Sequence, residues 1–197
     1  MVSAQDPDKD LIHKIQGGDQ SSFNQLVVKY RNRVMGVATR MLGDPAEAED
    51  LAQDVFVKVY HALGGFKGEA LFSTWLYRIT ANSCLNHRRR RKREDQVTGG
   101  VDDPEPIFAD GGANPHALLE RKELKSFLER AIRALPEEQR MVLILRDIEG
   151  LSYEEIAGSL GLELGTVRSR LHRGRLAVQA NIRETFSLDF DNRSVCL

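Results

Sequence analysis

Residues 151–178 read LSYEEIAGSLGLELGTVRSRLHRGRLAV, and they carry the strongest structural signal in the second part of the chain. Ser152 is a good helix N-cap, and Glu155, three residues later, completes a capping box. Gly161 lies where a tight turn needs a residue that tolerates positive φ. The pattern therefore predicts a short helix that ends in a turn, followed by a second helix.

The second helix is expected to start at Gly165 or Thr166. Its buried stripe is Val167, Leu171, Gly174 and Val178, at helical spacing. The opposite stripe is polar and basic, which suits a recognition helix, because Arg pairs with guanine edges and both Arg and Ser contact phosphates. We predict a DNA-binding helix-turn-helix that reads DNA with Arg168, Ser169, His172, Arg173 and Arg175. The alternative is an ordinary helical hairpin with a solvated basic face.

The first part of the chain, residues 8–93, also has helical periodicity. Asp44-Pro45 is a strong helix start, and Glu47 is expected to complete a capping box there. The following helix carries one apolar stripe, and Gly64-Gly65 is expected to end it. A loop then leads into a helix that ends in the basic run 88–93. Since no stretch alternates like a strand, the sequence predicts an all-α chain.

Charge divides the chain into parts of different character. Residues 1–93 hold 15 Lys and Arg against 10 Asp and Glu, whereas residues 94–116 hold six acidic residues and no basic one. That acidic segment also contains several Gly and Pro, and it cannot bury enough apolar surface to order itself. We therefore expect two small helical domains, 1–93 and 117–185, a flexible acidic linker over 94–116, and a tail over 186–197. Leu124, Phe127, Leu128, Ala131 and Leu135 mark the first long helix of the second domain.

Composition argues against several function classes. Cys84 and Cys196 are far apart and form neither a zinc pattern nor a disulfide framework, so we expect a cytoplasmic protein. Cys84 and His87 lie three apart, but two ligands make a weak metal site, and a small buried cysteine is the favoured interpretation. No apolar run approaches the roughly 20 residues that span a bilayer. We find no phosphate-binding glycine loop, nucleophile elbow or HExxH motif, so we expect no enzyme, metal or cofactor.

Five motifs together resemble one family. The segments LPEEQR at 135–140, GLSYEEIA at 150–157 and GTVRSRL at 165–171 resemble region 4 of a bacterial RNA polymerase sigma factor. The segments DLAQDVF at 50–56 and FSTWLYRITAN at 72–82 resemble region 2. Both sets occur in the expected order, and the match is nearest to the extracytoplasmic-function (ECF) group. The resemblance covers roughly residues 8–184.

The resemblance implies a role for each half. A sigma factor binds core RNA polymerase and directs transcription initiation at specific promoters, with region 4 reading the −35 element and region 2 opening and reading the −10 element. The −10 element is then expected to meet Phe66, Lys67, Trp75, Arg78, Asn82, Arg88 and Arg89. Trp75 could equally be a core residue, and the basic run could be a solvated helix end. The acidic linker is expected to thread through polymerase, or to be only a solubilising tether.

The resemblance also implies partners. The clamp helices of the largest polymerase subunit are expected to meet Asp50, Gln53, Asp54, Val57 and Lys58, and the flap of the second subunit is expected to meet region 4. Such factors are usually held by an anti-sigma protein and released in a stress or envelope response. The factor is expected to be inactive in promoter choice until it binds core polymerase. A regulator that binds DNA through the helix-turn-helix without polymerase is the alternative.

Overall fold

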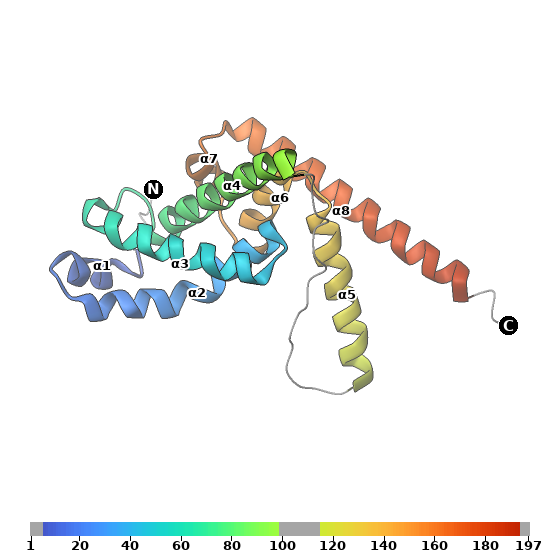
Figure 1. The fold of residues 1–197 in the computed structure, drawn as a ribbon, viewed down its shortest axis with the longest axis horizontal. Helices are drawn as coiled ribbons and strands as arrows, with labels where there is room; N and C mark the ends of the chain where they lie inside the picture. The colour runs from blue at the N-terminus through green and yellow to red at the C-terminus, as the bar shows by residue number, and fades with distance from the viewer. Residues whose placement is uncertain (1–5, 99–114, 194–197) are drawn as a thin grey trace.

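The computed structural model describes residues 6–98 and 115–193, which form helices and, within those ranges, no strand (Figure 1). This confirms the all-α prediction. We call 6–98 the N-terminal half and 115–193 the C-terminal half. The helices in chain order are α1 (Lys9–Gln16), α2 (Gln20–Leu42), α3 (Pro45–Ala62), the 3₁₀ turn η1 (Leu63–Gly65), α4 (Phe72–Thr98), α5 (Pro115–Arg133), α6 (Glu137–Leu143), the π-helical turn η2 (Ile144–Ile148), α7 (Tyr153–Leu160) and α8 (Leu164–Arg193).

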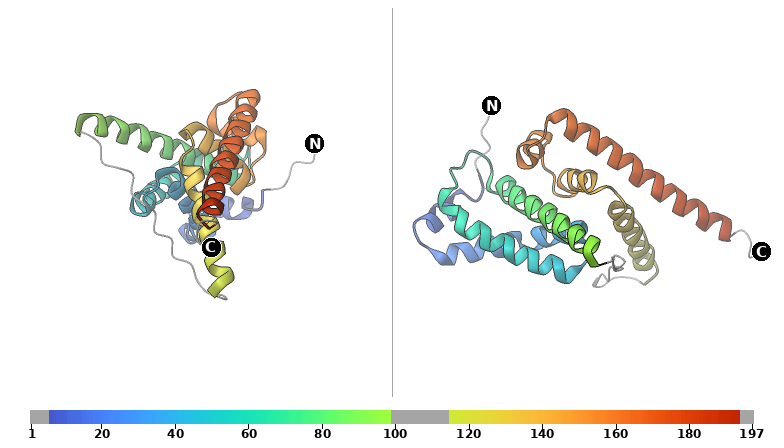
Figure 2. Two further views of the ribbon diagram at one scale, coloured as in Figure 1. Left: turned by 90° about the vertical axis from the view of Figure 1, so that its right-hand side faces the viewer. Right: turned by 45° about the horizontal axis from the view of Figure 1, so that its top comes forward.

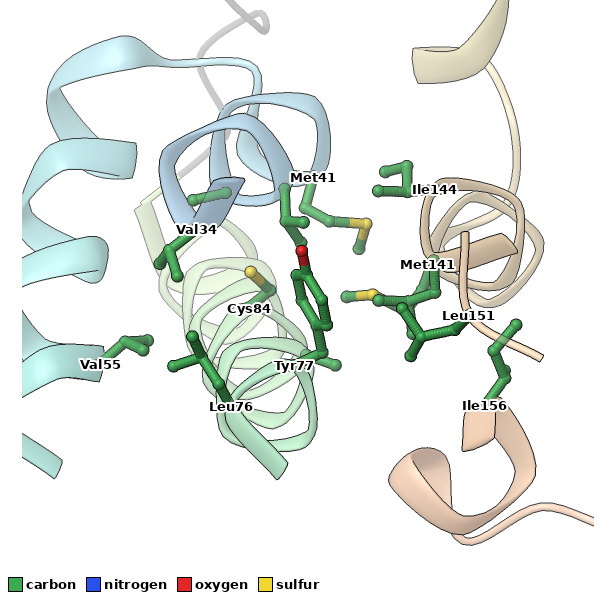
Figure 3. Packing of buried hydrophobic residues seen from close by; sticks show 14 of the residues in the cluster. Val34, Met41, Val55, Leu76, Tyr77, Cys84, Met141, Ile144, Leu151 and Ile156 are labelled. Atoms are coloured by element: carbon green, nitrogen blue, oxygen red, sulfur yellow. The ribbon is translucent and has the colours of Figure 1, made fainter. Parts of the chain in front are cut away.

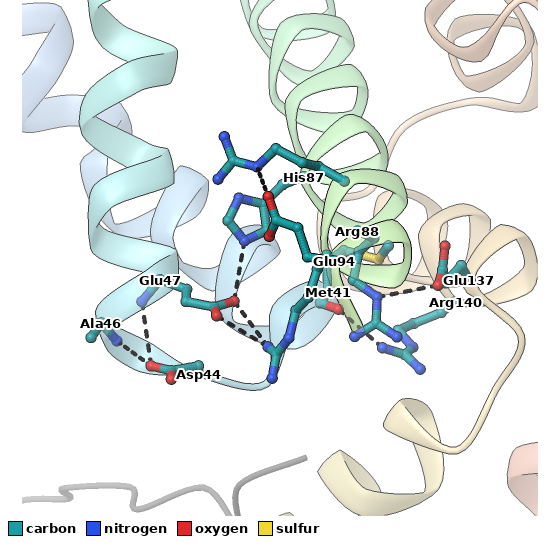
Figure 4. Close-up of polar contacts among 11 residues, drawn as sticks. Met41, Asp44, Ala46, Glu47, His87, Arg88, Glu94, Glu137 and Arg140 are labelled. Atoms are coloured by element: carbon teal, nitrogen blue, oxygen red, sulfur yellow. Dashed lines mark hydrogen bonds and ion pairs between the residues drawn. The ribbon is translucent and has the colours of Figure 1, made fainter. Parts of the chain in front are cut away.

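Three long helices, α2, α3 and α4, pack on one another in the N-terminal half (Figure 1). The start of α3 follows the sequence signal in part. The Asp44 carboxylate accepts from the backbone N–H groups of Ala46, at 2.7 Å, and Glu47, at 3.3 Å. The expected capping box is wrong, however, because the Glu47 side chain accepts instead from Arg91 of α4, at 3.1 Å (Figure 4). A long-range ion pair has taken the place of a local cap.

The helix-turn-helix of the C-terminal half is α7 followed by α8. The predicted capping box is present, since Ser152 Oγ accepts from Glu155 N and Glu155 Oε2 accepts from Ser152 N. Gly161 ends α7 in the left-handed region at φ 64°. Helix α8 begins at Leu164, earlier than predicted, because the Glu163 carbonyl accepts from the N–H groups of two following residues.

The halves share one hydrophobic core. Figure 3 shows Tyr77 of α4 and Met41 of α2 facing Met141, Leu151 and Ile156 of the C-terminal half, and all belong to a single buried cluster. Figure 2 shows α4 lying between α3 and the helices of the C-terminal half. Helix α4 is therefore the element through which both halves meet.

The helices extend beyond the domain boundaries expected from charge. Helix α4 continues past residue 93 to Thr98, α5 begins at Pro115, and α8 continues past residue 185 to Arg193. Most of the proposed linker, 99–114, and Cys196 lie outside the described residues. Of the helices described, none combines the length and apolar character needed to cross a membrane.

Candidate nucleic-acid and polymerase interfaces

The recognition face of α8 is built on a buried stripe. Val167, Leu171 and Gly174 are buried, and a Cβ at Gly174 would lie 3.6 Å from Gln139 and Leu143. The close approach of α6 at Gly174 fixes the rotation of α8 about its axis. The opposite side is therefore turned toward solvent.

The five predicted −35 residues are not equivalent. The side chains of Arg168, His172 and Arg173 are exposed. Ser169 is half-buried, and its hydroxyl donates to the Thr166 carbonyl at 3.0 Å. The Arg175 guanidinium donates to the Asp147 carboxylate through Nε, at 2.9 Å, and through Nη2, at 2.5 Å. The exposed surface best disposed to contact DNA is therefore Arg168, His172 and Arg173.

A second polar surface surrounds the loop between η1 and α4, residues 66–71, which we call the α4 loop. This loop, the first turns of α4 and helix α7 enclose an open hollow of about 710 Å³, which we call the α4–α7 hollow. Its N-terminal lining includes Phe66, Lys67, Trp75 and Arg78. Its lining from α7 includes Glu154 and Glu155, and Glu69 of the α4 loop adds an acidic side chain beside the basic and aromatic ones.

The aromatic wall of this hollow is ordered by ring contacts. The centroids of Phe66 and Trp75 are 5.1 Å apart, and each ring also packs against Phe72. Trp75 is half-buried, so it is both a core residue and part of the lining. Asn82 is exposed on α4, one turn beyond Arg78, outside the lining of the hollow.

The basic run at the end of α4 is largely engaged in ion pairs (Figure 4). Arg88 Nε lies 3.2 Å and Lys92 Nζ 2.8 Å from Glu137 of α6. Burial alone would raise the pKa of Glu137, but the hydrogen bond from Lys92 and the charge of Arg88 outweigh it and lower the pKa. Arg89 is exposed. In this arrangement part of the run joins the two halves, a role that no signal in the sequence predicted.

Polar contacts elsewhere on α4 also cross between the halves. Thr74 Oγ1 donates to Glu155 at 2.6 Å, and the Tyr77 hydroxyl donates to Glu149. Burial would raise the pKa of Glu155, but the hydrogen bonds from Thr74 and from Ser152 lower it. At the other side of the interface, Arg140 Nη1 donates to the Met41 carbonyl at 3.0 Å. The interface thus combines an apolar centre with charged hydrogen bonds.

The predicted polymerase-binding face lies on the solvent side of α3. Asp50, Gln53, Asp54, Val57 and Lys58 are all exposed. Val57 is 56% exposed although it is apolar, and Tyr60, 41% exposed, lies one turn further along. The exposure of Tyr60 beside this face was not predicted, because nothing in the sequence distinguished Tyr60 from its buried neighbour Val59.

An apolar groove of about 570 Å³ runs between α5, η2 and α8, and we call it the α5–α8 groove. Leu128 and Leu176, 41% and 51% exposed, lie along it, as does Ile148. The periodicity of α5 indicated a helix but not that Leu124 and Leu128 would remain exposed. In the sequence these leucines and the buried Leu135 belong to the same helical pattern, and only the packing of α5 on α8 determines which of them are buried.

Cys84 is fully buried on α4, and burial raises the pKa of its thiol to about 12. His87 Nε2 lies 3.2 Å from the Glu47 carboxylate. In the described ranges, no group of three or more His, Cys, Asp or Glu side chains could hold a metal ion. Cys84 is therefore a core residue, as the favoured interpretation predicted.

Comparison with known families gives a match in each half of the chain. Residues 26–94 match the family described as Sigma-70 region 2, and residues 128–178 match Sigma-70, region 4. The ECF RNA polymerase sigma-E factor of Escherichia coli K12 is 39% identical over 188 residues, covering 92% of this chain and 97% of the relative. The chain belongs to the ECF family of RNA polymerase sigma factors. This confirms the resemblance stated from the sequence.

Other relatives of this sigma factor agree. The RNA polymerase sigma-H factor of Pseudomonas aeruginosa is 40% identical over 181 residues, covering 88% of this chain and 93% of the relative. Among solved structures, the sigma factor RpoE of Bartonella quintana, in complex with the anti-sigma factor NepR, has a TM-score of 0.70 at 25% identity over 82% of this chain and 96% of that one. CnrH in complex with the cytosolic domain of CnrY has a TM-score of 0.65 at 25% identity, over 90% and 97%.

Proposed function

We propose that this sigma factor binds core RNA polymerase and selects promoters by reading the −35 element with α8 and the −10 element at the α4–α7 hollow. One observation carries the proposal. A single chain holds an exposed basic helix in its region-4 half, and aromatic and basic side chains of its region-2 half line the α4–α7 hollow. The factor acts in the cytoplasm and contributes binding, not catalysis, to initiation.

Duplex DNA is read at α8. Arg168 and His172 are four residues apart on one row of the helix, and Arg173 lies in the neighbouring row. An α-helix fits the major groove, where Arg can donate two hydrogen bonds to guanine. Arg175, held by Asp147, contacts the phosphate backbone once it exchanges that partner for DNA.

The −10 element must be read as a single strand. A base that leaves the DNA helix loses stacking free energy, and stacking on an aromatic ring of the protein restores part of it. Phe66 and Trp75 offer such rings, and Lys67 and Arg78 offer positive charge to the phosphates on either side. Asn82 and the exposed Arg89 continue the same path along α4. Arg88 joins them when its ion pair with Glu137 opens.

In the arrangement described here, α7 stands in the way of that strand. Glu154 and Glu155 line the same hollow as Lys67 and Arg78. A phosphate that entered would meet these carboxylates, and like charges at short range repel. The region-4 half must therefore move away from α4 before the −10 strand binds. This gives a physical reason for a factor that is inactive in promoter choice until polymerase separates its halves.

This chain offers polymerase two binding surfaces, one on each half, through which polymerase holds the halves apart. The acidic and apolar face of α3 around Asp54 and Val57 suits the clamp helices, and Tyr60 extends its apolar area. The α5–α8 groove, with Leu128 and Leu176 exposed along it, suits an apolar helix of the flap. The two contacts lie on different halves, so binding both favours separation.

The same surfaces suit an anti-sigma factor. One solved relative is in complex with the anti-sigma factor NepR, and another, CnrH, is in complex with the cytosolic domain of CnrY. We expect a protein of that class to cover the α3 face or the α5–α8 groove and so compete with polymerase. Release of the inhibitor would then start a stress or envelope response.

Co-elution with bacterial core polymerase, followed by transcription from a library of promoter fragments, tests this function. We expect a stable complex and initiation at a restricted set of start sites. A folded, inhibitor-free chain that binds promoter DNA but never binds core polymerase would instead support the regulator that acts without polymerase.

A further inference from the structure

The N-terminal segment of the chain lies against the α4 loop. Helix α1 packs on η1, and Ile12 is its buried residue. A hollow of about 630 Å³ separates α1 from the loop, and Gln16, Lys9 and His13 line it together with residues 66–71. The loop is thus bordered by α1 on one side and by the α4–α7 hollow on the other.

Gln16 holds the beginning of the loop. Its side-chain amide donates to the carbonyl of Leu63 at 3.1 Å and to that of Phe66 at 2.9 Å. The backbone N–H of Phe66 also donates to the Leu63 carbonyl at 3.1 Å. One amide group therefore fixes the main chain at the residue whose ring lines the α4–α7 hollow.

Asp6 holds the end of the loop. Its carboxylate accepts from the backbone N–H of Phe72, the first residue of α4, at 2.6 Å, and from the N–H of Asp8 at 2.9 Å. Asp8 is fully buried and accepts from Lys29 and from the Tyr30 hydroxyl. The ring of Tyr30 packs edge-on against Phe72 at 5.4 Å. The segment that holds the loop is thereby anchored in the core of the N-terminal half.

Gln16 contributes little to that anchoring, because its own side chain is exposed, while Ile12, Leu11 and Ile15 make the apolar contacts of α1. A residue that orders a functional loop lowers the entropy lost when the ligand binds. We propose that Gln16 is a positioning residue for −10 reading: its amide holds the Phe66 main chain so that the Phe66 ring stands ready for an unstacked base. This inference rests on the function proposed above for the hollow.

Gln16→Met tests the proposal, since Met has nearly the shape of Gln but no hydrogen-bond donor. Lys14→Met, an exposed position on the same helix, is the matched control, and Phe66→Ala tests the role of the hollow itself. Each variant is assembled with core polymerase on a promoter that carries 2-aminopurine at successive −10 positions of the non-template strand. Emission from the captured base is recorded, together with core affinity and Tm.

We expect Gln16→Met to lower the captured-base emission at least three-fold, with Tm and core affinity unchanged and Lys14→Met normal. Normal emission with Gln16→Met, alongside lost emission with Phe66→Ala, would overturn the positioning role and leave the hollow in place. Normal emission with Phe66→Ala would overturn the assignment of the hollow. A loss of emission with Gln16→Met that matches a fall in Tm would make the residue structural only and would also overturn the proposal.

Discussion

The two proposed DNA-reading surfaces differ in how they are presented. Arg168, His172 and Arg173 stand exposed on α8, whereas the α4–α7 hollow has one wall from the other half of the chain. The −35 surface can therefore meet duplex DNA in the arrangement described here. The −10 surface needs both a melted strand and the removal of Glu154 and Glu155. The difference indicates that closure of the halves restrains promoter opening more than it restrains −35 contact.

The largest effect is expected at the exposed surface. Arg168→Ala removes a guanidinium that can pair with a guanine, which costs about 1–3 kcal/mol, or roughly 5- to 150-fold in promoter affinity. Binding of the holoenzyme to promoters that vary in the −35 element measures it, with Arg130→Ala on α5 as the control. Unchanged affinity and unchanged base preference would remove Arg168 from the reading face.

The next largest effect is expected at the α4–α7 hollow, which the C-terminal half covers. Tyr77→Phe removes the hydroxyl that donates to Glu149 without changing the shape of the ring, and Thr74→Val removes the donor to Glu155. Together they should favour separated halves by about 1 kcal/mol, roughly five-fold. Energy transfer between dyes on α3 and α8 should fall in the free factor, and Tyr60→Phe should leave it unchanged. An identical transfer efficiency in the double variant contradicts the role of these bonds in closure.

A smaller effect is expected where polymerase binds. Asp54→Ala removes one exposed charge from the α3 face and should weaken core binding by about 0.5–1 kcal/mol, roughly two- to five-fold, mostly through slower association. The difference should shrink at high salt. Asp10→Ala, which removes an exposed acid from α1 and not from α3, is the matched control. Equal association rates for both variants would argue against the face around Asp54.

The smallest effect is expected with pH. The pKa values of Glu137 and Glu155 are lowered in the folded chain, so their contribution is present above the ordinary carboxyl pKa of 4.5 and is lost as pH falls below it. The urea midpoint should therefore change little between about pH 7 and pH 5.5 and drop as the pH is lowered from about 5 to about 3. Glu137→Gln should flatten that slope, whereas Glu138→Gln, whose side chain is 66% exposed, should retain it.

The parts that were predicted from the sequence rest on local chemistry. Ser152 and Glu155 are three residues apart, and their capping box needs no knowledge of the rest of the chain. The same holds for the Asp44 cap and for the turn at Gly161. The basic stripe of α8 could likewise be predicted from the sequence, because helical spacing alone puts Arg168 and His172 on one face.

The parts that were not predicted depend on contacts between distant residues. The Glu47 carboxylate pairs with Arg91 instead of completing the expected capping box. Glu137 of the C-terminal half forms ion pairs with Arg88 and Lys92 of the N-terminal half. Neither pairing has a signal in sequence spacing. For the same reason the acidic wall that α7 gives to the hollow was missed, since it arises only when the two halves pack.

A reversible lock between the halves tests whether they must separate before the −10 strand binds. Ser159 Oγ donates to the Thr74 carbonyl at 3.4 Å, so these positions of α4 and α7 are in contact. Thr74→Cys with Ser159→Cys, in a chain carrying Cys196→Ser, places two thiols at this contact, and mass spectrometry establishes that oxidation joins them by a disulfide. We predict that holoenzyme made with the oxidised chain does not open a duplex promoter, and that reduction restores opening. Full opening by the oxidised chain would show instead that the −10 strand binds without separation of the halves.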